Sequence, residues 1–445
     1  MSNARGFIYK KQFIIPYISG SSGWTRVMEA TNLSQDVWRD FGFLGNPLDP
    51  RPLGISHSDR QLIVGRDDEL RQFMVLSSSL QGAIIVEGNI GVGKTSFVNA
   101  AQHDLAKRGF LPSHQTIEIG ETTEPSDLIL SSLSNLVYSL EKTHGANACT
   151  KNPSLRDGKQ LVTSTMQSDW GGQLSILGTG GGIQRQQTAI APPAPVLATM
   201  TQKLDAWMNA ALQKYSCKAG IVLMNNFDRL PEQELVELLN RSRDLVLLRP
   251  KILWVLIGKI GMFNTLESQA RRVSEIITGQ PIVLNPLSLE TLHQAIEVRV
   301  KKFAAEPRAK LPVDKKFVDM LYEVSGGEIR FIFKRLTDIV YEVTSRLPSV
   351  EAIPDDLAMN VLRALAERRL SALPLSKGDQ SILRKMVESP FRIRDYARFK
   401  LSSQQALWKR VSRLMKMELL QSERKGPREV VYRTVADVNI AYGTS

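Results

Sequence analysis

Short apolar runs rich in β-branched residues alternate with amphipathic stretches along the middle of the chain. Such runs occupy residues 83–86, 116–119, 221–224, 252–257 and 282–284. Stretches such as 126–142 and 198–215 separate them and have the apolar spacing of helices. Buried strands that alternate with helices predict a parallel α/β sheet, here of five strands within residues 59–288.

Two segments do not follow this pattern. Residues 1–58 show no clear period, and the prolines near their end predict an irregular N-terminal lead-in. Residues 143–197 are polar and glycine-rich, and alternating segments at 173–177 and 183–187 predict a β-hairpin insert. A solvated linker is the alternative for this insert, because glycine-rich loops are often flexible.

The strands stop after residue 288. Helical spacing at 289–305, 314–323, 329–345 and 356–371 predicts a small helical bundle over 289–372. Within 373–445, three expected helices lie at 377–388, 392–399 and 403–417, and alternating strands follow at 419–423 and 430–434. Three helices and a hairpin predict a C-terminal winged helix-turn-helix domain.

The first strand leads into a phosphate-binding motif. Gly88-x-x-x-x-Gly93-Lys94-Thr95 stands between that strand and a helix, which is the context of a P-loop. Backbone N–H groups of such a loop surround phosphates, while the lysine reaches the outer phosphates and the threonine ligates Mg²⁺. We therefore expect ATP and Mg²⁺ as cofactors, held by Gly88, Gly91, Val92, Gly93, Lys94, Thr95 and Ser96.

The third strand lacks the acids that ATP hydrolysis requires at its carboxyl end. Asn225 and Asn226 stand where one carboxylate would join the Mg²⁺ shell and a second would polarise water. An amide can bind a metal-bound water, so Asn225 remains a candidate for the outer shell of Mg²⁺, but an amide cannot act as a base. Asp228 either replaces the acids or caps the next helix, and its distance along an extended chain favours the cap. The sequence thus predicts ATP binding with weak or absent hydrolysis.

The order of these motifs resembles the AAA+ ATPases, in the branch of origin-recognition and replication-licensing initiators and related bacterial ATPases of mobile elements and defence systems. The resemblance covers residues 41–437 and includes Val64-Gly65-Arg66, which in the family packs beside the adenine. It implies that Val64 and Arg66 line the nucleotide site and that residues 289–372 form a lid.

The resemblance also implies roles for arginines. Ser325-Gly326-Gly327-Glu328-Ile329-Arg330 resembles the family's second sensor, which makes Arg330 the candidate to reach the γ-phosphate. Without the family, Arg330 is simply a solvated helix residue. Arg271 or Arg272 is similar in position to an arginine finger that completes a neighbour's site, although a basic pair on an exposed helix has the same pattern.

Composition narrows the class of protein. With 42% hydrophobic and 23% charged residues and only two cysteines, the composition is typical of a globular cytoplasmic protein without a disulfide framework or zinc site. No apolar run reaches the length of a membrane span. The formal net charge is +12, and residues 376–445 hold 15 Lys+Arg against 7 Asp+Glu, so 15 − 7 = +8 lies in the last domain. This excess points to a polyanionic partner.

The helix predicted at 403–417 carries much of this charge. Trp408, Val411, Leu414 and Met415 recur at helical spacing and are expected to face the core. The basic side chains expected to contact DNA are those of Lys409, Arg410, Arg413 and Lys416 on the helix and Arg424, Lys425 and Arg428 on the wing. A winged helix used for protein contacts is the alternative.

Three functions remain open from the sequence. The leading hypothesis is a nucleotide-dependent DNA-binding switch that assembles with itself or with a partner. A protein scaffold or sensor with a structural nucleotide is the second, and an ATPase motor that uses Asp228 is the third. The biological process, whether replication, transposition or defence, does not follow from the residues.

Overall fold

The computed structural model describes residues 37–80, 82–167, 194–348, 350–426 and 429–443. Most of the predicted lead-in and both alternating segments of the predicted hairpin, 173–177 and 183–187, lie outside the described residues.

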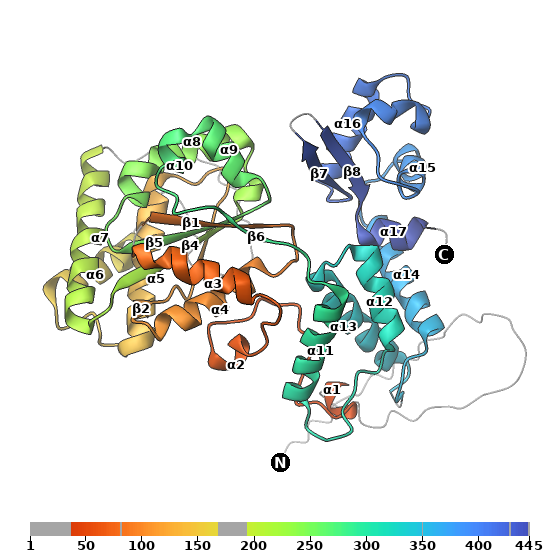
Figure 1. The fold of residues 1–445 in the computed structure, drawn as a ribbon, viewed down its shortest axis with the longest axis horizontal. Helices are drawn as coiled ribbons and strands as arrows, with labels where there is room; N and C mark the ends of the chain where they lie inside the picture. The colour runs from red at the N-terminus through yellow and green to blue at the C-terminus, as the bar shows by residue number, and fades with distance from the viewer. Residues whose placement is uncertain (1–36, 81, 168–193, 349, 427–428, 444–445) are drawn as a thin grey trace, which may run out of the picture. The chain divides into compact units, whose positions relative to one another are not determined.

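A parallel sheet forms the centre of the α/β region (Figure 1). Its six strands run in the order β2-β4-β5-β1-β6, and β3 pairs with β4 as well. The strands are β1 (Gly82–Gly88), β2 (Phe110–Leu111), β3 (Thr116–Glu118), β4 (Ala219–Asn225), β5 (Ile252–Gly258) and β6 (Ile282–Leu284). The α/β architecture predicted from the sequence is confirmed. The additional strand, β2, has two residues and is too short to show a period.

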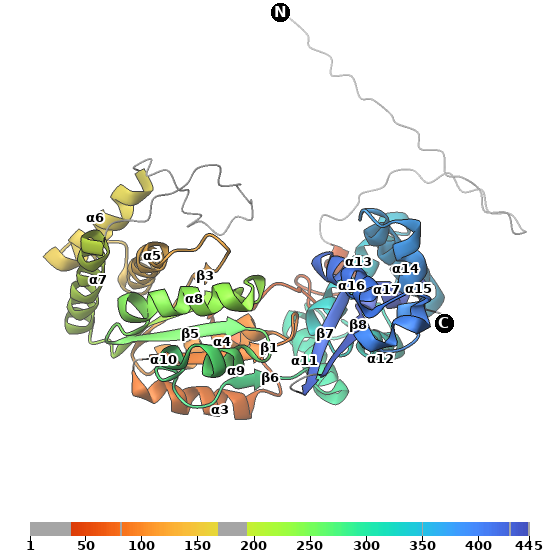
Figure 2. The ribbon, with the colours of Figure 1, turned by 90° about the horizontal axis from the view of Figure 1, so that it is seen from above.

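Helices cover both faces of this sheet, as Figure 2 shows for α3 and α8 on its opposite sides. Ile84 and Val86 lie in the core under α3 and α4, whereas Ile85 lies in the core under α5, α7 and α8. Alternate side chains of β1 thus point to opposite faces, and both faces are buried, which explains the unbroken apolar run. These helices are α3 (Asp67–Leu76), α4 (Lys94–Ala106), α5 (Pro125–His144), α7 (Ala194–Tyr215) and α8 (Glu232–Ser242).

Shorter elements complete this region. They are α2 (His57–Arg60), η1 (Ser77–Ser79), η2 (Phe227–Arg229), the π-helical segment η3 (Arg243–Leu247), α9 (Met262–Gln269) and α10 (Arg271–Ser274). The short helix α1 (Val37–Asp40) instead packs through Trp38 into the core of the helices that follow β6.

The predicted insert begins with a helix. Residues that the sequence assigned to a polar hairpin or linker form α6 (Pro153–Gln167), which packs beside α7. Leu155 is fully buried, and Gly158 lies so close to the indole of Trp207 that a side chain at that position would collide with it. Leu155, Gly158 and Val162, the buried positions of α6, recur at the spacing of a helix, but the polar, glycine-rich composition of residues 143–197 obscured this period.

Four helices form the predicted lid: α11 (Leu289–Phe303), α12 (Lys315–Ser325), α13 (Ile329–Arg346) and α14 (Asp355–Ser371). Ser288 caps α11 by accepting a hydrogen bond from the Thr291 N–H at 3.1 Å. Trp38 and Phe43 from the end of the lead-in are buried in the same core as Leu336. The last part of the lead-in therefore belongs to the lid, although its irregular sequence showed no such role.

The C-terminal module contains α15 (Lys377–Met386), the 3-10 segment η4 (Ile393–Phe399), α16 (Gln404–Lys416), β7 (Leu420–Gly426), β8 (Glu429–Thr434) and α17 (Ala436–Tyr442). The two strands form an antiparallel hairpin with Ser422 opposite Tyr432. Ser403 begins α16 by accepting a hydrogen bond from the Ala406 N–H at 3.2 Å. The final helix, α17, was not expected and packs on α14 of the lid.

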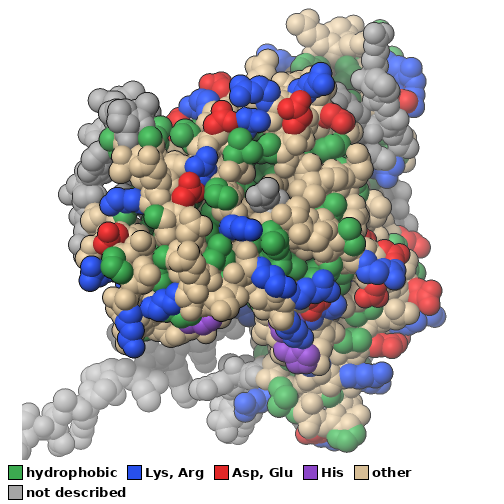
Figure 3. All heavy atoms as spheres, turned by 60° about the vertical axis from the view of Figure 1, so that its left-hand side comes forward, with side chains coloured by type: hydrophobic (Ala, Val, Ile, Leu, Met, Phe, Trp, Pro, Cys, Tyr) green, Lys and Arg blue, Asp and Glu red, His purple; other side chains and the backbone are tan. Residues whose placement is uncertain are grey.

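On the face drawn in Figure 3, the described Lys and Arg side chains are mixed with Asp and Glu. Among the described residues, no helix combines the length and the apolarity that a bilayer crossing requires.

Candidate nucleotide site

The P-loop connects the carboxyl end of β1 to the first turn of α4. Gly91 and Gly93 adopt φ of +79° and +94°, a left-handed backbone that glycine accepts without strain. These turns bring successive backbone N–H groups around the N-terminus of a 13-residue helix, where the helix dipole favours an anion. The backbone therefore has the form that a phosphate cradle requires.

Lys94 lies inside this loop. Its Nζ donates to the carbonyl oxygens of Gly88 at 2.7 Å and Asn89 at 2.9 Å. Burial lowers the pKa of Lys94; the nearby charge of Asp228 opposes this shift and that of Arg330 adds to it. The ammonium group is thus placed at the loop's mouth, with one acidic and one basic side chain close by.

The next two residues of the motif have different surroundings. Thr95 is half-buried in the first turn of α4, consistent with the predicted Mg²⁺ ligand. The hydroxyl of Ser96 accepts a hydrogen bond from the Leu53 N–H at 3.0 Å, and Asn99 Nδ2 donates to the Leu53 carbonyl at 2.7 Å. Ser96 therefore binds the lead-in as well as lining the site.

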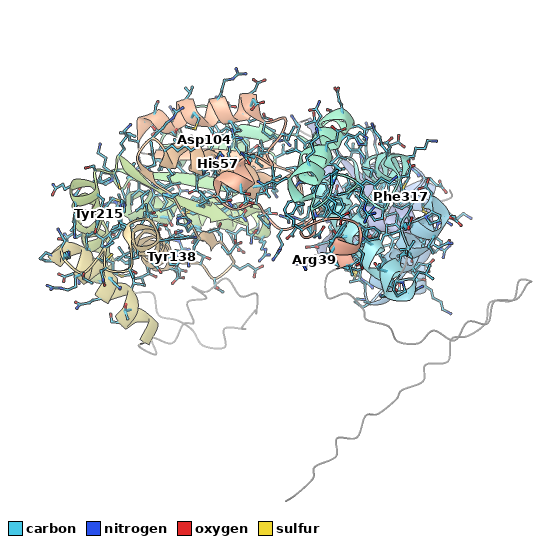
Figure 4. The ribbon with its side chains drawn as sticks, turned by 90° about the horizontal axis from the view of Figure 1, so that it is seen from below. Arg39, His57, Asp104, Tyr138, Tyr215 and Phe317 are labelled. Atoms are coloured by element: carbon cyan, nitrogen blue, oxygen red, sulfur yellow. The ribbon has the colours of Figure 1, made fainter. Side chains whose placement is uncertain are left out.

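Helix α2 fixes this part of the lead-in to the P-loop helix, and Figure 4 shows its His57 beside Asp104 of α4. Arg60 Nε lies 2.9 Å from Asp104 Oδ2, and His103 Nδ1 lies 2.8 Å from the Ile55 carbonyl oxygen. The lead-in is thus part of the nucleotide site, a role that its sequence did not indicate.

A pocket opens next to the P-loop, between it and the lid. Val64 and Arg66 line it, together with residues 49–53 of the lead-in and Arg299, Arg330 and Phe333 of the lid. Arg66 is buried and donates to the carbonyl oxygen of Asn285 at 2.6 Å and to Glu69 at 3.0 Å. Its guanidinium therefore links the start of α3 to the loop that follows β6. Val64 adds an apolar side chain to the lining of the pocket.

The lid touches the P-loop directly. The backbone N–H of Arg330 donates to the Gly91 carbonyl at 3.2 Å. The side chain of Glu328 packs on Gly91 so closely that a β-carbon at that glycine would collide with it. Burial raises the pKa of Glu328 to about 7. Residues 328–330 therefore contact the phosphate loop, and the reach of the Arg330 side chain to a γ-phosphate stays a prediction.

The end of β4 contains the two asparagines in place of acids. Asn226 adopts a left-handed φ of +68° and begins the 3-10 turn that contains Asp228. The following helix α8 has Pro231 at its N-cap, so the expectation that Asp228 caps that helix is wrong. Because the chain turns at Asn226 and is not extended, Asp228 comes close enough to act on Lys94.

A carboxylate that the sequence reasoning missed also lies here. Glu118 ends β3 directly opposite Asn225, and its Oε2 accepts a hydrogen bond from Asn226 Nδ2. Burial raises the pKa of Glu118, and the charge of Arg229 opposes that shift. The available signal was the polar residue at the end of the second strand, since parallel strands end at the same edge of a sheet.

Glu87 is a second missed residue. It is buried directly before the P-loop, and its carboxylate accepts from the Gly261 N–H at 2.9 Å and the Phe263 N–H at 2.6 Å. Burial raises the pKa of Glu87. Its role is to hold the start of α9 against the end of β1.

The basic pair proposed as an arginine finger is exposed. Arg271 Nε lies 3.5 Å from Glu275, and Arg272 Nη2 lies 3.7 Å from Asp244. Both side chains face outward from α10, so either remains available to a neighbouring molecule.

The basic helix α16 differs from the expectation. Leu407, not Trp408, is buried in the module core, and Trp408 is 52% exposed. Arg413 Nη2 lies 2.9 Å from Asp379 Oδ2 and Arg410 Nη1 lies 3.4 Å from Asp379 Oδ1. Arg410 is half-buried and Arg413 is exposed, so both reach the surface of α16, but the buried Asp379 carboxylate of α15 pairs with both, which the sequence did not show.

The remaining basic residues of this module keep their predicted places as far as they are described. Lys409 and Lys416 are exposed on α16. Arg428 and the side chains of Arg424 and Lys425 lie outside the described residues.

No protein-family model matches the chain, and no curated protein matches it in sequence. Solved structures resemble the chain in fold, at low sequence identity. The Aeropyrum pernix ORC1 protein in complex with DNA is 14% identical, with a TM-score of 0.47 over 92% of this chain and 96% of that one. Drosophila ORC bound to DNA is 13% identical, with a TM-score of 0.41 over 96% and 97% of the two chains.

Cdc6p from Pyrobaculum aerophilum is 12% identical, with a TM-score of 0.37 over 84% of this chain and 92% of that one. Because all three TM-scores lie under 0.5, the inferences about function below rest on the residues of the site itself.

Proposed function

We propose that this chain is an ATP-binding switch that binds DNA through its C-terminal module and hydrolyses ATP slowly. The observation that carries the proposal is the contact between the P-loop and the lid, in which the Arg330 N–H donates to Gly91. A phosphate bound in the loop would lie between Lys94 and Arg330. Nucleotide binding would therefore shift the equilibrium between the positions of the lid.

The residues present fit ATP and Mg²⁺. The N–H groups of residues 91–94 hold the phosphates, Lys94 exchanges its two carbonyl partners for phosphate oxygens, and Thr95 supplies a metal ligand. Mg²⁺ supplies charge neutralisation at the outer phosphates. The amide of Asn225 adds a hydrogen bond to this shell but no negative charge.

DNA binding is proposed for the exposed face of α16. Lys409 and Lys416 supply the salt-sensitive attraction to phosphates, and the hairpin β7–β8 takes the place of the wing in a winged helix-turn-helix. The +8 excess of residues 376–445 supports this assignment.

Oligomer formation follows from the same scheme. Arg271 or Arg272 on the exposed surface of α10 is the proposed finger that completes a neighbour's nucleotide site. Replacement of each by alanine is expected to leave ATP binding by the isolated protein unchanged and to abolish nucleotide-dependent assembly in analytical ultracentrifugation.

A protein scaffold is the second candidate function. It is favoured by the exposed indole of Trp408 and by the pairing of Arg410 and Arg413 with Asp379, which leaves less free positive charge on α16. In that case Trp408 anchors a protein partner.

Titration of a labelled DNA duplex at two salt concentrations, with and without ATP, tests the proposal. We expect binding that weakens with salt and tightens with ATP. Absence of binding at low salt in both states would rule out the DNA switch and leave the scaffold.

A further inference from the structure

Strand β4 brings no acid to the phosphate end of the site. Hydrolysis of ATP requires a carboxylate that orients and deprotonates the attacking water, and the amides of Asn225 and Asn226 cannot accept that proton. A chain that binds ATP at this loop either lacks hydrolysis or takes the carboxylate from another strand.

The register of the sheet offers one such strand. Thr116 pairs with Leu223, Ile117 with Met224 and Glu118 with Asn225, so β3 and β4 end at the same level. Glu118 is therefore the residue of β3 that lies beside the missing acids. Its neighbour Ile117 points into the core, which fixes the opposite orientation for Glu118.

Hydrogen bonds place the Glu118 carboxylate among the asparagine side chains. Asn226 Nδ2 donates to Glu118 Oε2, and Asn225 lies opposite Glu118 in the strand register. The left-handed backbone at Asn226 directs that amide back toward β3. One carboxylate thus lies within a hydrogen bond of Asn226 and beside Asn225, the two positions where acids are expected.

The same edge includes the phosphate-binding lysine. The charge of Asp228 acts on the ammonium group of Lys94 and on the carboxyl group of Glu118. Lys94 and Glu118 thus have Asp228, in the turn after β4, as a common charged neighbour.

We propose that Glu118 of β3 replaces the missing acid of β4 and serves as the base for ATP hydrolysis in this chain. The oxygen of a water molecule forms a bond to the γ-phosphorus while the bond from that phosphorus to the bridging oxygen breaks. ADP leaves with the electron pair of that bond. Glu118 accepts the water's proton and returns it to the released phosphate.

This inference rests on the proposed nucleotide site and adds the identity of the base. Asn226 is the positioning residue, because its amide holds one carboxylate oxygen and leaves the other for water. Hydrolysis is slow since no second carboxylate joins the metal shell at Asn225.

Exchange of the Glu118 and Asn226 side chains, and of Glu118 alone, tests the proposal. Glu118→Gln and Glu118→Asn are each expected to lower single-turnover hydrolysis at least tenfold while ATP affinity by calorimetry changes less than about twofold, because the base acts in the transition state only. The double variant Glu118→Asn, Asn226→Glu returns the carboxylate to β4, so its rate is expected to equal or exceed that of the wild type.

A binding measurement adds a readout that does not depend on turnover. ADP with aluminium fluoride imitates the transferring phosphoryl group with its in-line water, so Glu118→Gln is expected to lose the tighter binding of this complex relative to ADP alone. Unchanged melting temperatures of the variants show that the fold is retained.

Three results would overturn the inference: a wild-type rate equal to that of Lys94→Ala, an unaffected rate in Glu118→Gln, or no recovery in a folded double variant. If Lys94→Ala binds ATP as tightly as the wild type, the nucleotide site itself fails, which is a separate outcome.

Discussion

Arg335 of α13 and Asp437 of α17 form an ion pair in which Nη2 and Oδ1 lie 2.6 Å apart, with the aspartate fully buried. Arg369 of α14 pairs with the other carboxylate oxygen. Helix α13 begins at the P-loop with Glu328 and Arg330 and reaches Arg335 one turn later. One rigid helix therefore connects the P-loop to the last helix of the C-terminal module.

Loss of the Asp437 carboxylate is expected to uncouple the proposed DNA binding from ATP binding. Asp437→Asn removes the buried carboxylate that Arg335 and Arg369 share, while Arg335 keeps Asp338 at 3.2 Å. The expected cost is therefore below the about 3–5 kcal/mol of a buried pair that is broken outright. We expect a lower denaturation midpoint and DNA affinity that no longer responds to ATP. Linkage then requires that DNA no longer tightens ATP binding either.

Arg346→Ala is the matched control, since Arg346 pairs with Glu342 on the exposed surface of the same helix. Its expected effect on unfolding free energy is below about 1 kcal/mol. Retention of the ATP effect in a folded Asp437→Asn protein would show that α17 is not the connection.

Removal of the P-loop lysine is expected to abolish ATP binding. Lys94→Ala deletes the ammonium group that faces the outer phosphates while its two carbonyl partners, Gly88 and Asn89, remain free to bind water. Isothermal calorimetry measures the change in affinity, and Lys107→Ala at the far end of α4 serves as the control. Equal affinity in both variants would refute the assigned site.

Steady-state hydrolysis by the wild type is expected to stay below about 1 s⁻¹, at the low end of enzyme rates. The physical reason is the amide of Asn225 at the metal side, which adds no negative charge. A phosphate-release assay checks this, and a wild-type rate of about 1 s⁻¹ or more would refute the expectation.

The carboxyl group of Glu328 predicts a pH dependence. Its pKa is raised by burial from 4.5 to about 7, so the folded state binds a proton that the unfolded state has released. This contribution to stability is complete below pH 4.5 and is lost as pH rises to about 7, by up to about 2 kcal/mol after allowance for partial exposure. The charged groups that act on Glu328 are Arg330, Arg335, Arg369 and Asp437.

Glu328→Gln is expected to flatten this slope in denaturant titrations between pH 5 and about 7.5. It is also expected to tighten ATP binding at about pH 8, where the wild-type carboxylate is charged beside Gly91 and repels phosphate. Identical slopes in wild type and variant would show that Glu328 titrates normally.

Salt dependence distinguishes DNA-binding lysines from structural charges on α16. Lys409→Ala with Lys416→Ala is expected to weaken DNA binding and reduce the salt slope by about one unit for each DNA phosphate that the variant no longer neutralises. Arg413→Ala removes one of the two arginines that pair with the buried Asp379 carboxylate. Its main expected effect is therefore a lower free energy of unfolding. A salt slope unchanged in the lysine variant, measured by fluorescence anisotropy, would favour the protein-scaffold function.

Local residue patterns determined most of the framework. The run Ile84-Ile85-Val86 followed by Gly88 to Thr95 predicted a buried strand, a phosphate loop and a helix, because each depends on neighbours in the chain. The helices of the lid followed from their apolar period for the same reason.

Only the tertiary structure decided which distant residues meet. Glu118 and Asn226 are 108 residues apart and touch because parallel strands end at one edge of the sheet. The basic face of α16 is at the surface as its helical period predicted, but the pairing of its arginines with the buried Asp379 was missed, because Asp379 is on another helix and a helical period cannot show it. Trp38 joined the lid core in the same way, since burial depends on all the elements that surround a side chain and not on its neighbours in sequence.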